Sequence, residues 1–168
     1  MEINALIEKI IPPSDREHRD GFSNVSIIEN LTVIERNKIE DALVNMLNFS
    51  SIENLDTLIV ETLAYLKSTK SIFKLKDLLK KSNSNLDKLI IATSIFEISA
   101  EDEMLNVAVA SFKNIDNKAD PYYIYKLSDG FDYLIRFRNP VSTKIIQDYT
   151  QHTDPIISYN AKRALAKI

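Results

Sequence analysis

The chain has 168 residues, of which 45% are hydrophobic and 27% are charged, and this composition is typical of a soluble globular domain with its own core. Its 24 acidic and 21 basic residues give a net charge of −3, which excludes strong electrostatic attraction to nucleic acid and is compatible with a basic protein partner. The absence of cysteine excludes disulfides, thiol nucleophiles and thiolate metal sites. With only two glycines, the chain favours helices joined by short polar turns over hairpins or phosphate-binding loops.

The N-terminal part of the chain predicts short helices around one polar loop. Apolar residues recur at helical spacing over residues 2–11, and Pro12 ends this helix. Residues 14–24 are the most polar stretch and predict an irregular loop, followed by a short helical piece at 26–31. Neither a signal peptide nor a membrane span is expected, because the apolar runs are too short. We therefore expect a cytoplasmic protein that has no membrane partner.

The rest of the chain predicts a regular succession of helices. Thr32 and Glu35 have the spacing of a capping box, in which each side chain accepts a hydrogen bond from the other residue's backbone amide, and this helix runs to about Leu47. Seven more helices are expected at residues 55–67, 71–81, 86–98, 101–113, 121–138, 141–151 and 155–167. Gly130 is an expected weak point inside one of them. The sequence thus predicts an all-α protein of about eight or nine helices.

A sequence repeat organises these helices. Residues 54–66, NLDTLIVETLAYL, match residues 85–97, NLDKLIIATSIFE, and such self-similarity is typical of repeat architectures. An aspartate also recurs every 31 to 34 residues ahead of a helical run: Asp56, Asp87, Asp120 and Asp154. Each is expected to cap its helix by accepting hydrogen bonds from first-turn amides, which explains it without a catalytic role. Because a single helix hairpin cannot bury its own core, the hairpins are expected to stack on one another.

The last copy carries a resemblance to a known family. Residues 154–168, DPIISYNAKRALAKI, resemble a HEAT repeat in their Asp-Pro start and their alanine spacing, although Ile156 stands where the family usually has arginine. The resemblance covers about residues 54–168 and implies an α-α superhelix, or HEAT-like solenoid. Most such families bind proteins. Residues 1–53 would add N-terminal helices and the polar loop, giving a single helical-repeat domain over residues 1–168.

A second resemblance concerns architecture alone. Small, acidic, single-domain helical repeats without a catalytic centre are similar to some immunity proteins of bacterial polymorphic toxins, which bind and block one cognate toxin. This resemblance implies a toxin as the partner. The HEAT-like families also include the alkylpurine DNA glycosylases, which place the same stack of helices around a basic DNA-binding groove.

The two histidines are the candidates for a catalytic or metal-binding residue. His18 lies among carboxylates in the polar loop, where a metal could bind, but a solvated loop is the preferred interpretation. His152 lies in the turn before Asp154 and is interpreted as a helix C-terminal residue. The sequence has no H-E-x-x-H motif and no glycine-flanked serine. We therefore expect no catalytic residue, no cofactor and no metal, and a protein that is not an enzyme.

The helix expected at residues 121–138 carries the candidate partner-binding residues. One side of it is apolar, and the opposite side presents a tyrosine stripe at helical spacing: Tyr122, Tyr125, Asp129, Asp132, Tyr133 and Arg136. Tyrosine and arginine are enriched at interface hot spots, because they combine buried area with a polar group. Two interpretations stay open, since the tyrosine stripe either recognises a protein partner or packs against the next repeat.

The leading functional hypothesis is a non-enzymatic protein-binding module, specifically an immunity protein that occludes a cognate bacterial toxin. One alternative is a scaffold or adaptor subunit of a larger assembly, which would have several partners. Another is a HEAT-like DNA glycosylase, against which the isoelectric point near 5.5 and the absence of tryptophan argue. A homo-oligomer is also considered, because the open end of a helical stack leaves an apolar face to bury.

Overall fold

The computed structural model describes residues 3–168, so the first residue of the expected N-terminal helix, Glu2, lies outside the described part of the chain. Within residues 3–168 there is no strand, and the all-α class is confirmed. The α-helices are α1 (Ile3–Ile10), α2 (Arg16–Arg19), α3 (Val25–Glu29), α4 (Val33–Phe49), α5 (Thr57–Tyr65), α6 (Ile72–Lys81), α7 (Asn85–Ser99), α8 (Glu103–Ile115), α9 (Tyr123–Leu134), α10 (Pro140–Tyr149) and α11 (Pro155–Leu165). Three short 3₁₀ helices are η1 (Ile52–Asn54), η2 (Thr69–Ser71) and η3 (Ile135–Phe137).

The described residues thus form eleven α-helices, where eight or nine were expected. The difference lies near the N-terminus, where α2 is a single turn inside the stretch expected to be irregular and α3 is the short helical piece. The helix expected at residues 121–138 is also divided into α9 and η3. It stops there because Arg138 has a left-handed φ of 46° and because Pro140 disfavours a helical conformation at Asn139.

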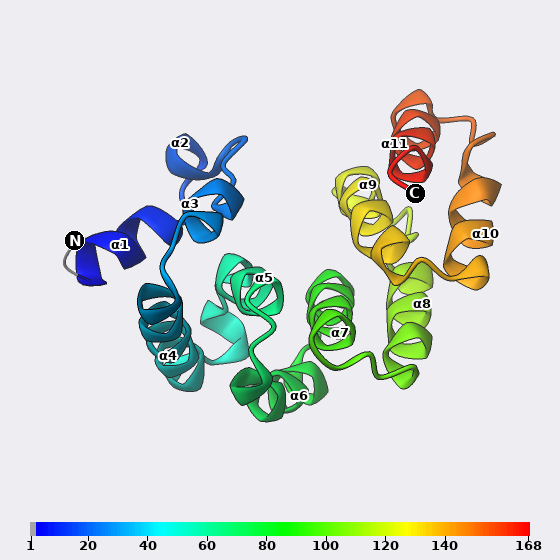
Figure 1. Cartoon of the computed structure of the whole chain (residues 1–168). Coiled ribbons are helices and arrows are strands. Elements are labelled where there is room, and N and C mark those ends of the chain that lie inside the picture. Colours follow the sequence, from blue (N-terminus) through cyan, green and yellow to red (C-terminus); the bar gives the residue numbers. More distant parts are fainter. Residues whose placement is uncertain (1–2) are drawn as a thin grey trace.

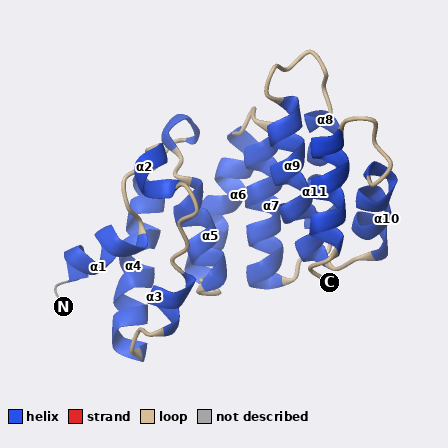
Figure 2. Ribbon diagram, turned by 90° about the horizontal axis from the view of Figure 1, so that it is seen from above, coloured by secondary structure: helices blue, strands red, loops and turns tan. Residues whose placement is uncertain are grey.

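The helices follow one another in chain order around an arc (Figure 1). Its inner side is formed by α5, α7 and α9, whereas α4, α6, α8 and α10 lie on the outer side. Seen from above, α5, α7, α9 and α11 lie next to one another (Figure 2). The central element is α7, which packs against α5, α6, α8 and α9.

The burial of α7 follows from this central place. All of its residues from Leu89 to Ile95 are buried, so the hydroxyl group of Thr93 needs a partner inside the core. It donates a hydrogen bond of 2.8 Å to the backbone oxygen of Leu89, one turn earlier. The matching threonine of the first repeat copy, Thr62 in α5, donates in the same way to the backbone oxygen of Leu58. The repeated sequence therefore places a polar residue at the same buried position in two adjacent helices.

The repeated aspartates do not all cap a helix. Asp56 is the N-cap of α5 and accepts a hydrogen bond from the Leu58 amide, and Asp154 is the N-cap of α11, as expected. The prediction for Asp87 is wrong, because Ser84 caps α7 one turn earlier and accepts a hydrogen bond from the Asp87 amide itself. Serine is as good a cap as aspartate, and it precedes Asp87 in the chain, so α7 begins before the aspartate.

Asp120 also differs from the expectation. The N-cap position of α9 is occupied by Tyr122, whose side chain makes no capping hydrogen bond. Asp120 instead closes the turn before α9, where its Oδ1 accepts a hydrogen bond of 2.8 Å from the Tyr122 amide. Its other oxygen pairs with Lys126 Nζ at 2.7 Å. The aspartate therefore orders the entry to α9 without being its cap.

Gly130 has a packing role inside α9. A Cβ atom at this position would lie 3.0 Å from the Cδ2 and Cε2 atoms of Phe112 in α8, closer than nine in ten Cβ contacts in proteins. The Phe112 ring also lies 5.3 Å from the Phe131 ring, measured between centroids. The glycine thus lets α8 and α9 approach closely, and the expected weak point is a point of close contact between two helices.

Candidate functional site

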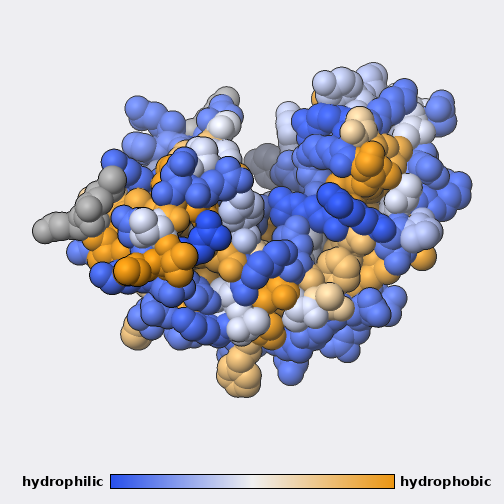
Figure 3. Space-filling model, in the orientation of Figure 1, coloured by the Kyte–Doolittle hydropathy of each residue, from blue (hydrophilic) through white to orange (hydrophobic). Residues whose placement is uncertain are grey.

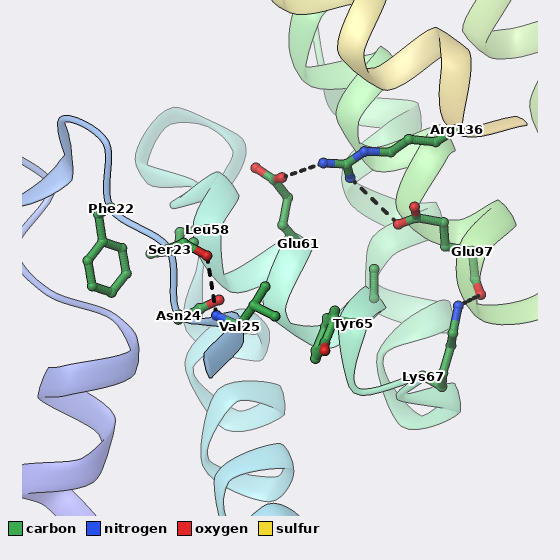
Figure 4. A pocket seen from close by; sticks show the side chains of 11 residues that line it. Phe22, Ser23, Asn24, Val25, Leu58, Glu61, Tyr65, Lys67, Glu97 and Arg136 are labelled. Carbon is green, nitrogen blue, oxygen red and sulfur yellow. Dashed lines mark hydrogen bonds and ion pairs between the residues drawn. The ribbon is translucent and has the colours of Figure 1, made fainter. Parts of the chain in front are cut away.

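The inner side of the arc contains a cleft of about 440 Å³, which we call the inner cleft (Figure 4). One wall is the segment at residues 22–25, which leads into α3. The opposite wall comes from α5, α7 and η3 and carries the charged residues Glu61, Glu97 and Arg136. In the space-filling view the molecule is hollowed between its N-terminal part on the left and its C-terminal part on the right. Hydrophilic residues line the right side of this hollow (Figure 3). The inner cleft therefore combines a wall of mixed polar and apolar residues with a charged one.

Buried polar contacts hold the N-terminal wall of the inner cleft against α5. The side-chain nitrogen Nδ2 of Asn24 donates hydrogen bonds to Thr62 Oγ1 at 2.7 Å and to the backbone oxygen of Ile10 at 3.1 Å. Arg19 pairs with Asp56 at 2.7 Å, so one aspartate both caps α5 and binds the polar loop. The loop at residues 14–24 is consequently fixed to the first repeat, which its polar composition did not predict.

Three residues of the charged wall, Glu61, Glu97 and Arg136, form with Tyr133 a group of four side chains that we call the clasp. The Tyr133 hydroxyl donates a hydrogen bond of 2.9 Å to Glu61 Oε1, and Arg136 Nη2 donates one of 3.3 Å to Glu61 Oε2. Arg136 Nη1 lies 3.7 Å from Glu97 Oε2. The guanidinium group of Arg136 also lies over the Tyr133 ring, 4.9 Å from its centroid. The clasp thus joins α5, α7 and the end of α9 (Figure 4).

The inner side of the arc shifts the pKa values of three groups. Burial raises the pKa of Glu97, although the charges of Arg136 and Lys67 oppose this. Burial also raises the pKa of Tyr133, and the Glu61 carboxylate raises it further, which keeps the Tyr133 hydroxyl a hydrogen-bond donor. Asp129 is exposed, yet partial desolvation and the charge of Asp132 raise its pKa. The negative charges of Glu97 and Asp129 are therefore only partly offset by their surroundings.

The structure divides the predicted tyrosine stripe into two groups. Tyr133 and Arg136 belong to the clasp, and Asp132 pairs with Arg163 and Lys167 of the following repeat at 2.9 Å and 2.8 Å. These three residues make intramolecular contacts. The second group lies toward the beginning of α9 and consists of residues that face solvent: Tyr122, Tyr125 and Asp129. A partner-binding role stays a prediction for all six residues.

Two residues of the site were not predicted at all. Glu61 and Glu97 are single glutamates within otherwise apolar helical runs, and their sequence neighbourhood carries no motif. Their significance comes from contacts with Arg136, which is 75 residues after Glu61. Only a correct stacking of α5, α7 and η3 would have identified them, because local periodicity reports contacts within one or two turns of a helix.

Both histidines contact residues that are close to them in the chain. His18, in the single turn α2, has its Nδ1 2.7 Å from Asp15 Oδ1, and His152 Nδ1 accepts a hydrogen bond of 3.0 Å from the Asp154 amide. Within residues 3–168 there is no group of three or more histidine, aspartate and glutamate side chains that could hold a metal ion. Over the same residues, each helix is too short or too polar to cross a membrane. Comparison of the chain with protein-family models, with curated proteins and with solved structures found no match.

Proposed function

We propose that the chain is a HEAT-like solenoid that acts as a non-enzymatic protein-binding module. The observation that carries this proposal is the exposure of Tyr122 and Tyr125, at 64% and 66%, at the beginning of α9. Helical spacing places them on the same side of α9 as Tyr133 and Arg136, which line the inner side of the arc. Large amphipathic side chains that bury much surface area on binding are typical anchors of protein interfaces.

The solenoid part of the proposal is supported by the arrangement of the two sequence copies. The matching segments form α5 and α7, which pack directly against each other, and their threonines take the same buried role. The helices α5, α7, α9 and α11 also lie in one row (Figure 2), which supports the proposal that they are equivalent helices of successive repeats. Stacked repeats of this kind offer an extended concave surface to a partner.

The narrower proposal is an immunity protein that occludes a toxin. A preformed helical surface loses little conformational entropy on binding, so it suits tight inhibition of one partner. Asp129 lies beside the exposed tyrosines in the helical pattern of α9, and it would pair with a basic group of the toxin surface. In this mechanism the tyrosines cover the active site of the toxin and the carboxylate selects the correct partner.

The test begins with a tagged pull-down from the native cell, followed by size-exclusion chromatography and mass spectrometry. Calorimetry with the purified partner then compares the natural chain with Tyr122→Ala and Tyr125→Ala. We expect each variant to weaken binding about tenfold or more, as hot-spot truncations do. The matched control is Phe73→Ala, because Phe73 is 87% exposed on α6, at the outer side of the arc.

The outcomes separate the alternatives. One stoichiometric partner that is toxic when expressed alone supports the immunity proposal, and several partners in a large complex indicate a scaffold or adaptor. Salt-dependent DNA binding with release of a base would indicate a glycosylase and would refute the non-enzymatic proposal. Unchanged affinity in both tyrosine variants would show that the binding surface lies elsewhere on the arc.

A further inference from the structure

The clasp connects helices that are not neighbours in the stack. Glu61 belongs to α5, whereas Tyr133 and Arg136 belong to α9 and η3, and Figure 1 shows α7 between α5 and α9. The packing of α5 against α7 and of α7 against α9 is made by buried side chains. The contacts of the clasp are instead made by side chains that extend over the inner side of α7. It is therefore an additional, polar connection across α7, to which Tyr133 contributes its hydroxyl group while its ring packs against the apolar core.

The repeat leaves room for this connection. Under the shift of 31 residues that aligns the two copies, the position in α7 that corresponds to Glu61 is Ala92. Ala92 is completely buried, and its methyl group is the shortest side chain other than glycine. At the position that matches Glu61, α7 therefore has no long side chain that would compete with the glutamate for Tyr133, 72 residues after Glu61.

The contacts within the clasp also restrict its geometry. Each oxygen of the Glu61 carboxylate has its own donor, since Oε1 accepts from Tyr133 and Oε2 accepts from Arg136. Arg136 is further held by its stacking over Tyr133 and by the charge of Glu97. A carboxylate with two donors and a guanidinium with three contacts have few alternative rotamers, so the separation of α5 and α9 is limited to a narrow range.

We propose that the clasp fixes the curvature of the arc and thereby the width of the inner cleft. When a stack of helices straightens, the inner edges of second neighbours move apart more than those of adjacent helices, because two small rotations add. The clasp bridges this most sensitive distance. Its rupture opens the arc while the core contacts of each adjacent pair remain. This inference does not depend on the identity of a partner.

The absence of cysteine makes the curvature measurable. Two cysteines introduced at exposed positions, Asn45→Cys in α4 and Lys162→Cys in α11, can carry spin labels on helices that lie on opposite sides of α5, α7 and α9. Double electron–electron resonance then gives the distribution of distances between them. We expect a longer mean distance and a broader distribution in Glu61→Ala than in the otherwise natural chain. Tyr133→Phe, which removes one hydroxyl group, is expected to shift the distribution in the same direction by a smaller amount.

The matched control is Asp132→Asn. Asp132 also forms ion pairs between repeats, with Arg163 and Lys167, but α9 and α11 are directly packed neighbours. We expect its distance distribution to coincide with that of the natural chain. Circular dichroism and thermal unfolding establish that each labelled variant is folded, and Tyr133→Phe decides the test if Glu61→Ala does not fold. Coincident distributions for the folded clasp variants and the natural chain would overturn the proposal.

Discussion

The Tyr133 hydroxyl donates a hydrogen bond to Oε1 of Glu61, which lies 72 residues earlier in the chain, with 2.9 Å between the two oxygen atoms. For this tyrosine the sequence left open a partner-binding role and a packing role, and the structure shows it joining α9 to α5. Burial and the neighbouring carboxylate raise the pKa of Tyr133, so the phenol stays a donor over the whole neutral range. This contact gives Tyr133 an intramolecular role, while the solvent-facing Tyr122 and Tyr125 have the most exposed surface of the stripe's tyrosines for a partner.

The first prediction measures the strength of this hydrogen bond. Tyr133→Phe keeps the ring and its stacking with Arg136 but removes the donor, so we expect a loss of about 1 kcal/mol in the free energy of unfolding. Urea denaturation followed by circular dichroism gives this value. Tyr125→Phe, at an exposed position of the same helix, is the control and should be nearly neutral. Equal values for the two variants would contradict a stabilising contact.

A second prediction concerns the pH dependence of stability. The pKa of Glu97 is raised in the folded protein, mainly by burial, against the opposing charges of Arg136 and Lys67 and with a further increase from Glu61. Above its unfolded pKa the native state therefore holds more protons at this site than the unfolded state. Linkage then requires that the contribution of Glu97 to stability falls as the pH rises through this window. The stability of Glu97→Gln relative to the natural chain should consequently increase from acidic to neutral pH.

The control for this pH series is Glu53→Gln. A hydrogen bond from Ser51 lowers the pKa of Glu53, so the native state holds fewer protons there than the unfolded state. Its contribution to stability is present above the unfolded pKa and is lost as the pH falls through the folded value. The relative stability of Glu53→Gln should decrease with rising pH, opposite to Glu97→Gln. Chemical denaturation at several pH values tests both signs, and parallel slopes for the two variants would refute the argument.

A third prediction follows from the correction at the start of α7. Ser84→Ala removes the N-cap hydrogen bond and should cost about 1 kcal/mol. Asp87→Ala removes only the attraction between a carboxylate and the first turn, and should cost about 0.3 kcal/mol. Thermal and urea unfolding of the two variants rank these effects. If Asp87→Ala were the more damaging change, the capping role expected from the repeated aspartate would be restored.

Features that depend on contacts within one or two helical turns were predicted from the sequence, whereas features that depend on distant contacts were not. The capping box of Thr32 and Glu35 was predicted and is confirmed, because all of its hydrogen bonds lie within one turn. The helices were located by their apolar spacing for the same reason. Asp87 was misjudged because Ser84, only three residues earlier, is an equally good cap. Local signals thus find a helix end but do not decide between two competing caps.

The candidate site was mostly beyond such local signals. Tyr133 and Arg136 were named from their spacing on one helix, but their partners Glu61 and Glu97 come from other repeats. These partners depend on how far each helix is rotated in the stack, which is set by the packing of the whole core. The sequence likewise could not show whether Tyr122 faces solvent or a neighbouring helix, because α9 packs against several other helices.

A fourth prediction tests the attachment of the N-terminal loop. Arg19 pairs with Asp56 and donates to the backbone oxygen of Pro12, so Arg19→Met keeps the aliphatic stem and removes both contacts. With a local stability loss of about 1.4 kcal/mol, chymotrypsin should cleave after Phe22 about tenfold faster. His18→Gln lies in the same loop, where its pair with Asp15 is exposed, and should leave the rate unchanged. Equal cleavage of Arg19→Met and the natural chain would mean that the ion pair does not hold the loop.

The last prediction uses the close approach of α8 and α9. In an isolated helix Gly130→Ala would be stabilising by about 1 kcal/mol. Here the new methyl group would lie 3.0 Å from the Phe112 ring and 3.4 Å from Leu89 Cδ2, and such overpacking costs about 1 to 3 kcal/mol. We therefore expect a net loss of stability of about 1 kcal/mol in urea denaturation. A gain in stability would show that the two helices separate at no cost.

A double-mutant cycle identifies the cause of this loss. Phe112→Leu removes the ring edge that the new methyl group would meet, so Gly130→Ala should cost at least about 0.5 kcal/mol less in that background. Gly21→Ala is the comparison, because Gly21 has a φ of +69° and no atom within 4 Å of its Cβ position. Its cost is backbone strain, about 1 kcal/mol, and Phe112→Leu should not change it. Coupling that is equal at both glycines would exclude the ring contact as the origin of the effect.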